Sequence, residues 1–152
     1  MTSPLAAHPY APVTAGPVRI VIRHRADAVA TGAVVRDFVR AQGMTNHHAV
    51  VAATAAVELA QNIVSHGGAC GEMSAWISGE TLFVRAIDRG PGLTESPAMF
   101  GDVRPTGSYG GSGLGQGSAS VRRLMDGVDV RARVAGGLEV IARKSIRWEP
   151  VL

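Results

Sequence analysis

The stretch from Thr45 to His66 constrains the fold more than any other part of the sequence. Thr45 or Asn46 can cap a helix there, and Gly67-Gly68 ends it. Apolar residues fill both flanks of this helix, which is typical of a helix buried in a core. A polar stripe interrupts them, and its first five members stay within about 40° of one line along the helix. The stripe consists of His47, Thr54, Glu58, Asn62, Ser65 and His66.

A carboxylate and an amide on a buried helix need partners, because burying them without hydrogen bonds is costly. One interpretation is a polar network that closes against a loop. The other is a ligand cavity that faces the stripe. In that case the carbonyl oxygen of Asn62 suits a hard cation such as Mg²⁺. Glu58, one turn earlier, could accept a proton or orient a nucleophile.

The remaining patterns predict a strand and a helix before this segment, and two strands, a long loop, a helix and two strands after it. Strands alternating with helices in this order favour an α+β two-layer sandwich, with a mixed, mostly antiparallel sheet and helices on one face. Residues 1–17, rich in Pro and Ala, are interpreted as a flexible arm, and residues 18–152 as a single domain. The expected elements are strands 18–24, 72–78, 81–88, 128–134 and 138–144, helices 27–42 and 118–126, and the loop 89–117.

Composition narrows the function classes. Hydrophobic residues make up 46% of the 152 residues, which excludes wholesale disorder, and no apolar run approaches the ~18 residues of a membrane span. The single Cys70 cannot form an internal disulfide, and the N-terminus lacks a charged region before an apolar one, so a cytoplasmic protein is expected. The net charge of +3 comes from residues 101–152, where seven arginines and Lys144 outnumber five acids. Because aromatic residues are only 5%, stacking platforms are lacking and nucleic-acid binding is not expected.

A second motif, Asp88-Arg-Gly-Pro-Gly92, follows the strand-like segment 81–88. An acid at a strand end can accept a hydrogen bond from an amino group in a cleft. The glycines would let a planar ring approach the backbone. The alternative is that Asp88 simply forms a turn, as Asp before Gly often does.

A third motif is the glycine-rich run 110–117, which precedes a predicted helix. Backbone N–H groups gathered before a helix N-terminus can bind phosphate, whereas a flexible loop is the alternative. The run is not a P-loop, since no Gly-Lys-Ser/Thr follows, and it lacks the dinucleotide fingerprint. Together the three motifs predict an ATP site that does not use a P-loop.

The boxes Glu58-Leu-Ala-Gln-Asn62, Asp88-Arg-Gly-Pro-Gly92 and Gly113-Leu-Gly-Gln-Gly117 resemble those of the GHKL superfamily, which shares the Bergerat ATP-binding fold. Within it the chain is most similar to the free-standing anti-sigma-factor serine kinases, and among these to the RsbT-type switch kinases. The resemblance covers about residues 18–145.

The resemblance implies a role for each box. Glu58 would be the catalytic base and Asn62 the Mg²⁺ ligand, while Asp88 would bind the adenine amino group. The remaining cofactor-binding residues would line the base pocket (Gly90 and Gly92) or close over the phosphates (Gly113, Leu114, Gly115 and Gly117). Two features depart from the pattern: Leu138 follows Gly137 where the family often has Thr, and His66 is more like the anti-sigma factors.

The implied function is an ATP- and Mg²⁺-dependent protein serine/threonine kinase of a partner-switching pathway. Its substrate would be a STAS-domain antagonist, and it would activate a PP2C-type phosphatase. Two alternatives stay open: an anti-sigma factor that binds and inhibits a sigma factor, and an ATP-gated binding module without phosphoryl transfer.

Overall fold

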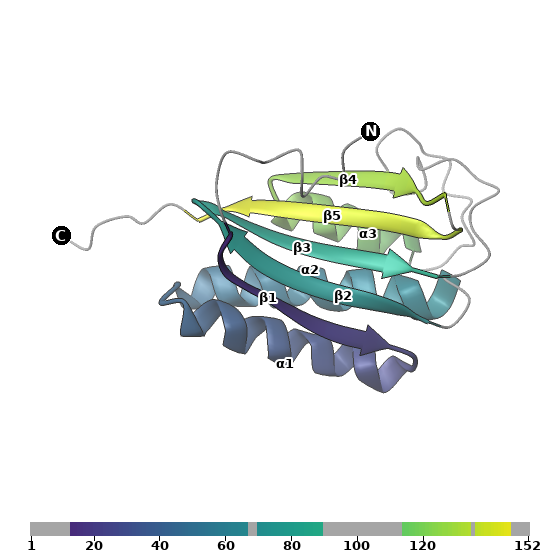
Figure 1. Ribbon diagram of the computed structural model, residues 1–152, viewed down its shortest axis with the longest axis horizontal. Helices are drawn as coiled ribbons and strands as arrows, with labels where there is room; N and C mark the ends of the chain where they lie inside the picture. The colour runs from purple at the N-terminus through teal and green to yellow at the C-terminus, as the bar shows by residue number, and fades with distance from the viewer. Residues whose placement is uncertain (1–12, 67–69, 90–113, 135, 147–152) are drawn as a thin grey trace.

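The computed structural model describes residues 13–66, 70–89, 114–134 and 136–146, which form one layer of strands and one of helices (Figure 1). In chain order the elements are β1 (Val13–Ile22), α1 (Arg25–Ala41), α2 (Asn46–His66), β2 (Gly71–Ser78), β3 (Thr81–Asp88), α3 (Leu114–Leu124), β4 (Gly127–Ala132) and β5 (Leu138–Ser145). None of these helices is long and apolar enough to cross a bilayer.

The sheet has the strand order β1-β2-β3-β5-β4, and all four pairings are antiparallel. The α+β fold class is therefore confirmed, whereas the expectation of a mixed sheet is wrong for the strands that the structure describes. The reason is that β5 turns back from β4 and pairs with β3. The parallel strands β3 and β4 are thereby kept apart.

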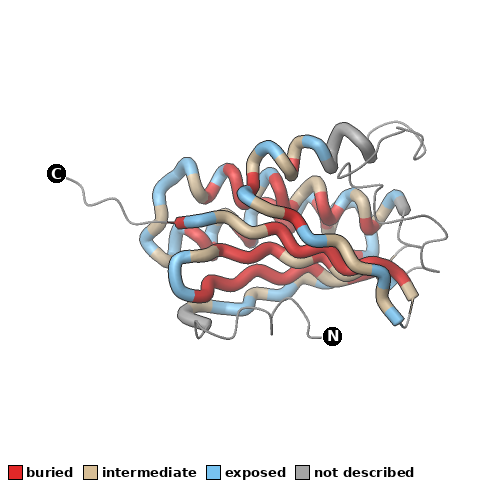
Figure 2. Tube along the Cα trace, turned by 90° about the horizontal axis from the view of Figure 1, so that it is seen from above, coloured by how far each residue is buried: buried red, intermediate tan, exposed pale blue. Residues whose placement is uncertain are grey.

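Helices α1, α2 and α3 all cover one face of the sheet, as predicted (Figures 1 and 2). Alternate residues of the strands face them: Met73, Leu82 and Val140 are buried in the same core as Leu59 of α2. The opposite face carries a second, small cluster, in which the rings of Trp76 and Phe83 stack with centroids 5.1 Å apart. The central strands are thus buried on both faces, so the residues at their ends are attached to a well-packed sheet.

We expect Leu59→Ala to lower the free energy of unfolding by about 2–5 kcal/mol, because Leu59 is only 1% exposed and its truncation leaves a cavity. Val50→Ala on the same helix is the control. Val50 is 54% exposed, so the change should stay within about 0.5 kcal/mol. Urea denaturation followed by circular dichroism measures both. A cost for Leu59→Ala as small as that of the control would contradict the packing of α2 on the sheet.

Two predicted boundaries differ from the structure by more than two residues. Strand β1 begins at Val13, whose partner is Ser78, so residues 13–17 belong to the sheet rather than to the arm. As an edge strand, β1 tolerates Pro17, since a proline there breaks no central ladder. Helix α3 begins at Leu114 rather than near residue 118, so Gly115 and Gly117 are helical and not part of a loop. The rest of the predicted arm and of the long loop lies outside the described residues.

Candidate functional site

One end of the sheet collects the elements that carry the predicted motifs. Strand β3 finishes there at Asp88, and β2, its antiparallel partner, starts there at Gly71. Helix α2 ends shortly before β2, so its last turns lie at the same end (Figure 1). Asn62 stands four residues before the end of α2, and Glu58 one turn earlier.

Helix α3 leads back to this end as well. Strand β4 runs parallel to β3, because both pair antiparallel with β5, and it therefore starts at the far end of the sheet. Two residues after α3, Asp126 fixes the link to β4, since its backbone nitrogen donates to the Arg143 carbonyl at 2.8 Å. The Asp126 carboxylate accepts from the Ser145 nitrogen at 2.6 Å, which lowers the pKa of Asp126. From there α3, about 16 Å long, places its first turn at the Asp88 end.

Gly71 brings α2 and Asp88 together. It is the register partner of Asp88, and a Cβ on it would lie 2.7 Å from Cγ2 of Ile63, the neighbour of Asn62, and would overlap the Ile87 carbonyl oxygen. Only a residue without a side chain lets helix and strands meet this closely. The Asn62 turn of α2 is therefore held directly beside the end of β3.

Asn62 carries an unusual atom. Its amide nitrogen Nδ2 is buried and has no hydrogen-bond partner in the described part of the chain. Buried polar groups without a partner are rare in native structures and point to a missing ligand, ion or water. Rotation about the terminal bond exchanges the two ends of the amide, so the oxygen can also be turned toward a cation.

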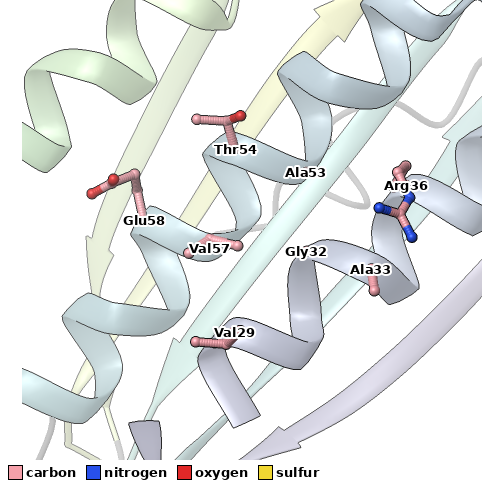
Figure 3. Close-up of a pocket in the computed structure, with 8 residues that line it drawn as sticks. All are labelled: Val29, Gly32, Ala33, Arg36, Ala53, Thr54, Val57 and Glu58. Carbon is pink, nitrogen blue, oxygen red and sulfur yellow. The ribbon is translucent and has the colours of Figure 1, made fainter. Parts of the chain in front are cut away.

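Glu58 is half-buried, one turn before Asn62. Figure 3 shows its side chain pointing away from α1, toward the side of α2 on which α3 packs. The carboxylate thus points toward the flank of α2 that faces α3.

The polar stripe as a whole does not line a closed cavity. His47, Thr54 and Ser65 are exposed, and Thr54 Oγ1 donates to the carbonyl of Val50, on the same helix, at 2.8 Å. Helix α2 is covered by the sheet on one side and flanked by α1 and α3, which leaves its remaining face open. The expectation of a helix buried nearly all round is therefore wrong. Of the stripe residues whose burial the structure describes, Glu58 and Asn62 stay candidates for a site.

Two hollows that are lined by described residues lie beside α2, and neither is lined by Asn62 or Asp88. The larger, about 420 Å³, is a groove between α1 and α2 with Glu58 at its edge (Figure 3). Gly32 and Val57 line this groove and lie close together. A Cβ on Gly32 would lie 2.7 Å from Val57 Cγ2. The smaller, about 190 Å³, is lined by Arg25, Gln61, Val64 and Ser65. Both open on the helical surface, so we place the candidate site at the end of the sheet instead.

Asp88 is half-buried and is held from two sides. Next to it, the Arg89 nitrogen donates to the Cys70 carbonyl at 3.1 Å. On the other side, Arg133 Nη1 donates to the Asp88 carbonyl oxygen at 3.0 Å. Gly137 lies against Asp88 so closely that a Cβ there would be 2.8 Å from Oδ1 and would overlap the carbonyl oxygen.

Other predicted site residues fall into two groups. Gly90, Gly92 and Gly113 lie outside the described residues. Leu114, Gly115 and Gly117 belong to the first turns of α3, at the same end as Asp88. Leu138, the departure from the family pattern, is 5% exposed and packs in the main core.

Sequence reasoning missed Arg133 and the role of Gly137 beside Asp88. The pair Gly136-Gly137 is visible in the sequence as a hairpin turn, and both residues have positive φ. Nothing in the spacing links Arg133 to Asp88, because 45 residues separate them and only the insertion of β5 beside β3 brings the hairpin to that strand end.

In the described part of the chain, no group of three or more His, Cys, Asp or Glu side chains could hold a metal ion. A dedicated protein cage for a cation is therefore not found there. Mg²⁺ does not require one, since it keeps several waters and is often held by one or two protein oxygens together with substrate phosphates. A single amide such as that of Asn62 fits this manner of binding.

No protein-family profile and no curated protein matches the chain by sequence, whereas its fold matches solved structures. One contains the RsbU and RsbW domains of Rv1364c from Mycobacterium tuberculosis. It has a TM-score of 0.61 and 17% identity, over 87% of this chain and 33% of that chain. Another is the SiaB–SiaC complex from Pseudomonas aeruginosa, with a TM-score of 0.63 and 11% identity, over 91% of this chain and 94% of that chain. The chain has the GHKL-type fold.

The GHKL fold agrees with the superfamily that the three sequence boxes resemble. At identities of 17% and 11%, the likeness to these structures shows the fold and not the chemistry. The chain spans 33% of the length of the first neighbour, so it corresponds to one part of that larger protein.

Proposed function

We propose that the chain is an ATP- and Mg²⁺-dependent protein serine/threonine kinase of the partner-switching type. The observation that carries the proposal is the amide nitrogen of Asn62, which is buried and has no hydrogen-bond partner among the described residues, on the α2 turn beside the end of β3. Two further features at the same end of the sheet support the proposal. Asp88 would accept a hydrogen bond from a base, and the first turn of α3 would offer its N–H groups to phosphates.

ATP would be held at three points. The Asp88 carboxylate would accept a hydrogen bond from the adenine amino group, with Gly90 and Gly92 lining the base. The first turn of α3, with Leu114, Gly115 and Gly117, would offer free N–H groups and the positive end of the helix dipole to the phosphates. Gly113 would join them.

Asn62 would hold Mg²⁺ through its side-chain oxygen, and the phosphates would supply further ligands. Bound in this way, the cation neutralises the charge that develops on the phosphates during transfer. A cation held by Asn62 would bring the phosphate chain beside Glu58, because the two residues are one helical turn apart.

Glu58 would then accept the proton of the acceptor hydroxyl. The oxygen of a serine or threonine forms a bond to the γ-phosphorus, the bond between that phosphorus and the β–γ bridging oxygen breaks, and ADP leaves. The hydroxyl proton goes to the Glu58 carboxylate. Little other covalent chemistry is needed, so correct positioning provides most of the catalysis.

A STAS-domain antagonist as substrate and a PP2C-type phosphatase as second partner belong to the proposal. Both solved neighbours support it, because each structure contains a second protein or domain. One holds an RsbW domain together with an RsbU domain, and the other is a SiaB–SiaC complex. The same likeness supports a role in partner-switching regulation. Co-purification with a sigma factor instead of a STAS protein would favour an anti-sigma factor.

We expect Asp88→Asn to weaken ATP binding by about 1.5–3 kcal/mol, the contribution of a hydrogen bond to a charged group. Isothermal titration calorimetry with Mg²⁺ measures the change. Asp129→Asn is the control, since Asp129 lies on β4 and pairs with Arg143 at 2.8 Å, outside the site. Equal ATP affinity in the wild type and Asp88→Asn would remove Asp88 from the adenine site.

A further inference from the structure

The tip of the β4–β5 hairpin is built around Arg133. The Arg133 nitrogen donates to the Gly137 carbonyl at 2.9 Å, and the Gly136 nitrogen donates to the Arg133 carbonyl at 3.0 Å. These bonds close the turn and fix the direction in which the arginine leaves the backbone. Its half-buried guanidinium reaches across to β3, where Nη1 donates to the Asp88 carbonyl oxygen.

This contact continues the pairing of β3 with β5 beyond its last residue pair. The register ends at Ile87 and Glu139, one residue before Asp88. At the next position the guanidinium, rather than a strand, bonds to the β3 backbone. Nη1 also lies 3.5 Å from the Gly136 carbonyl oxygen, so one charged group ties the hairpin tip to the strand end.

Gly137 makes the close approach possible. With φ of +83°, it adopts a conformation that residues with a side chain rarely take, and it presents bare backbone to Asp88. Because the hairpin lies on one side of Asp88 and Gly71 pairs with it on the other, the backbone that carries the carboxylate cannot turn freely.

We propose that Arg133 is a positioning residue that sets the direction of the Asp88 carboxylate and thereby selects a purine with a 6-amino group. The inference rests on the proposed function, which assigns Asp88 to the adenine amino group. A hydrogen bond to a pre-oriented carboxylate costs less ordering on binding than one to a mobile carboxylate. Loss of Arg133 should therefore weaken only those nucleotides that use Asp88.

The test compares ATP with purine riboside triphosphate, which lacks the 6-amino group, in calorimetric titrations with Mg²⁺. The wild type should bind ATP about tenfold or more tightly than the analogue, since only ATP donates to the carboxylate. Arg133→Ala should lose roughly 3–10-fold in ATP affinity and change less than about twofold for the analogue. Arg131→Ala, two residues away on β4, is the matched control and should preserve the wild-type ratio.

The outcomes separate the two hypotheses. If Arg133→Ala keeps the wild-type preference for ATP, or weakens both nucleotides equally, Arg133 is not a positioning residue for Asp88, and the proposed function is untouched. If the wild type itself does not distinguish ATP from the analogue, the adenine role of Asp88 fails and the inference falls with it. Should Arg133→Ala not fold, Arg133→Lys is measured in the same way, because it keeps the charge but loses the planar fork. A reduced ATP preference in that variant supports the proposal, and an unchanged one overturns it.

Discussion

Replacing Glu58 by alanine should lower phosphoryl transfer to a STAS-domain serine or threonine by about 10²–10⁴-fold, the usual contribution of a positioned proton acceptor. ATP affinity should stay close to that of the wild type, since the carboxylate would contact the acceptor hydroxyl and not the groups that bind the nucleotide. Incorporation of labelled phosphate into the STAS protein, measured beside an ATP titration, gives both quantities.

Two further variants sharpen this result. Asn62→Ala should lose Mg²⁺-dependent ATP binding together with transfer, which separates the metal ligand from the base. Thr54→Ala is the matched control, because Thr54 lies one turn before Glu58, is exposed and donates its hydroxyl to the Val50 carbonyl of its own helix. If Glu58→Ala transfers phosphate at the wild-type rate, the base lies elsewhere. If the wild type binds ATP but labels no STAS protein, the kinase proposal gives way to an ATP-gated binding module.

Gly137→Ala should lower the free energy of unfolding by about 3 kcal/mol or more, because strain and overlap act together. The new Cβ would meet the Asp88 carbonyl group, and the backbone would remain at a positive φ. ATP binding should fall in the same variant, since the hairpin can relieve the overlap only by moving away from Asp88. Thermal and urea denaturation measure the stability, and calorimetry measures the binding.

Gly79→Ala is the control for the backbone contribution. Gly79 also has a positive φ, of +60°, but it lies in the β2–β3 turn at the opposite end of β3. It should cost roughly 1–2 kcal/mol, the price of the left-handed conformation for a residue with a side chain. Equal costs for the two variants would mean that the contact of Gly137 with Asp88 adds nothing.

Most of the helices and strands could be predicted from the sequence because their local signals agree with their packing. Helix α2 begins at Asn46, as the Thr45 cap predicts, and Thr45 Oγ1 accepts from the His48 nitrogen at 3.2 Å. The start of α3 could not be predicted. Glycines argue against a helix by propensity, yet packing against α2 and the core, where Val121 is 1% exposed, outweighs that preference.

The candidate site was only partly accessible from the sequence. Glu58 and Asn62 share one helix, so their spacing predicts a common direction. Asp88 stands at a strand end, and the sequence can suggest its chemistry but not its surroundings. The contacts of Arg133 and Gly137 with Asp88 depend on which strands are neighbours in the sheet. That information is not local, because β5 pairs with β3 across more than fifty residues.

The central position of β5 affects how the chain can be made and shortened. β5 is the last of the described strands to be synthesised, yet it lies between β3 and β4. One edge of β3 therefore stays without its partner strand until synthesis has passed Ser145. Nascent chains that stall before this point, or fragments cut after α3, would present β3, with its buried Leu82, Phe83 and Val84, as an open edge, which is a template for aggregation. Removing β5 should therefore yield insoluble protein rather than a smaller domain, whereas a chain ending just after Ile146, which is itself 3% exposed, retains the complete sheet.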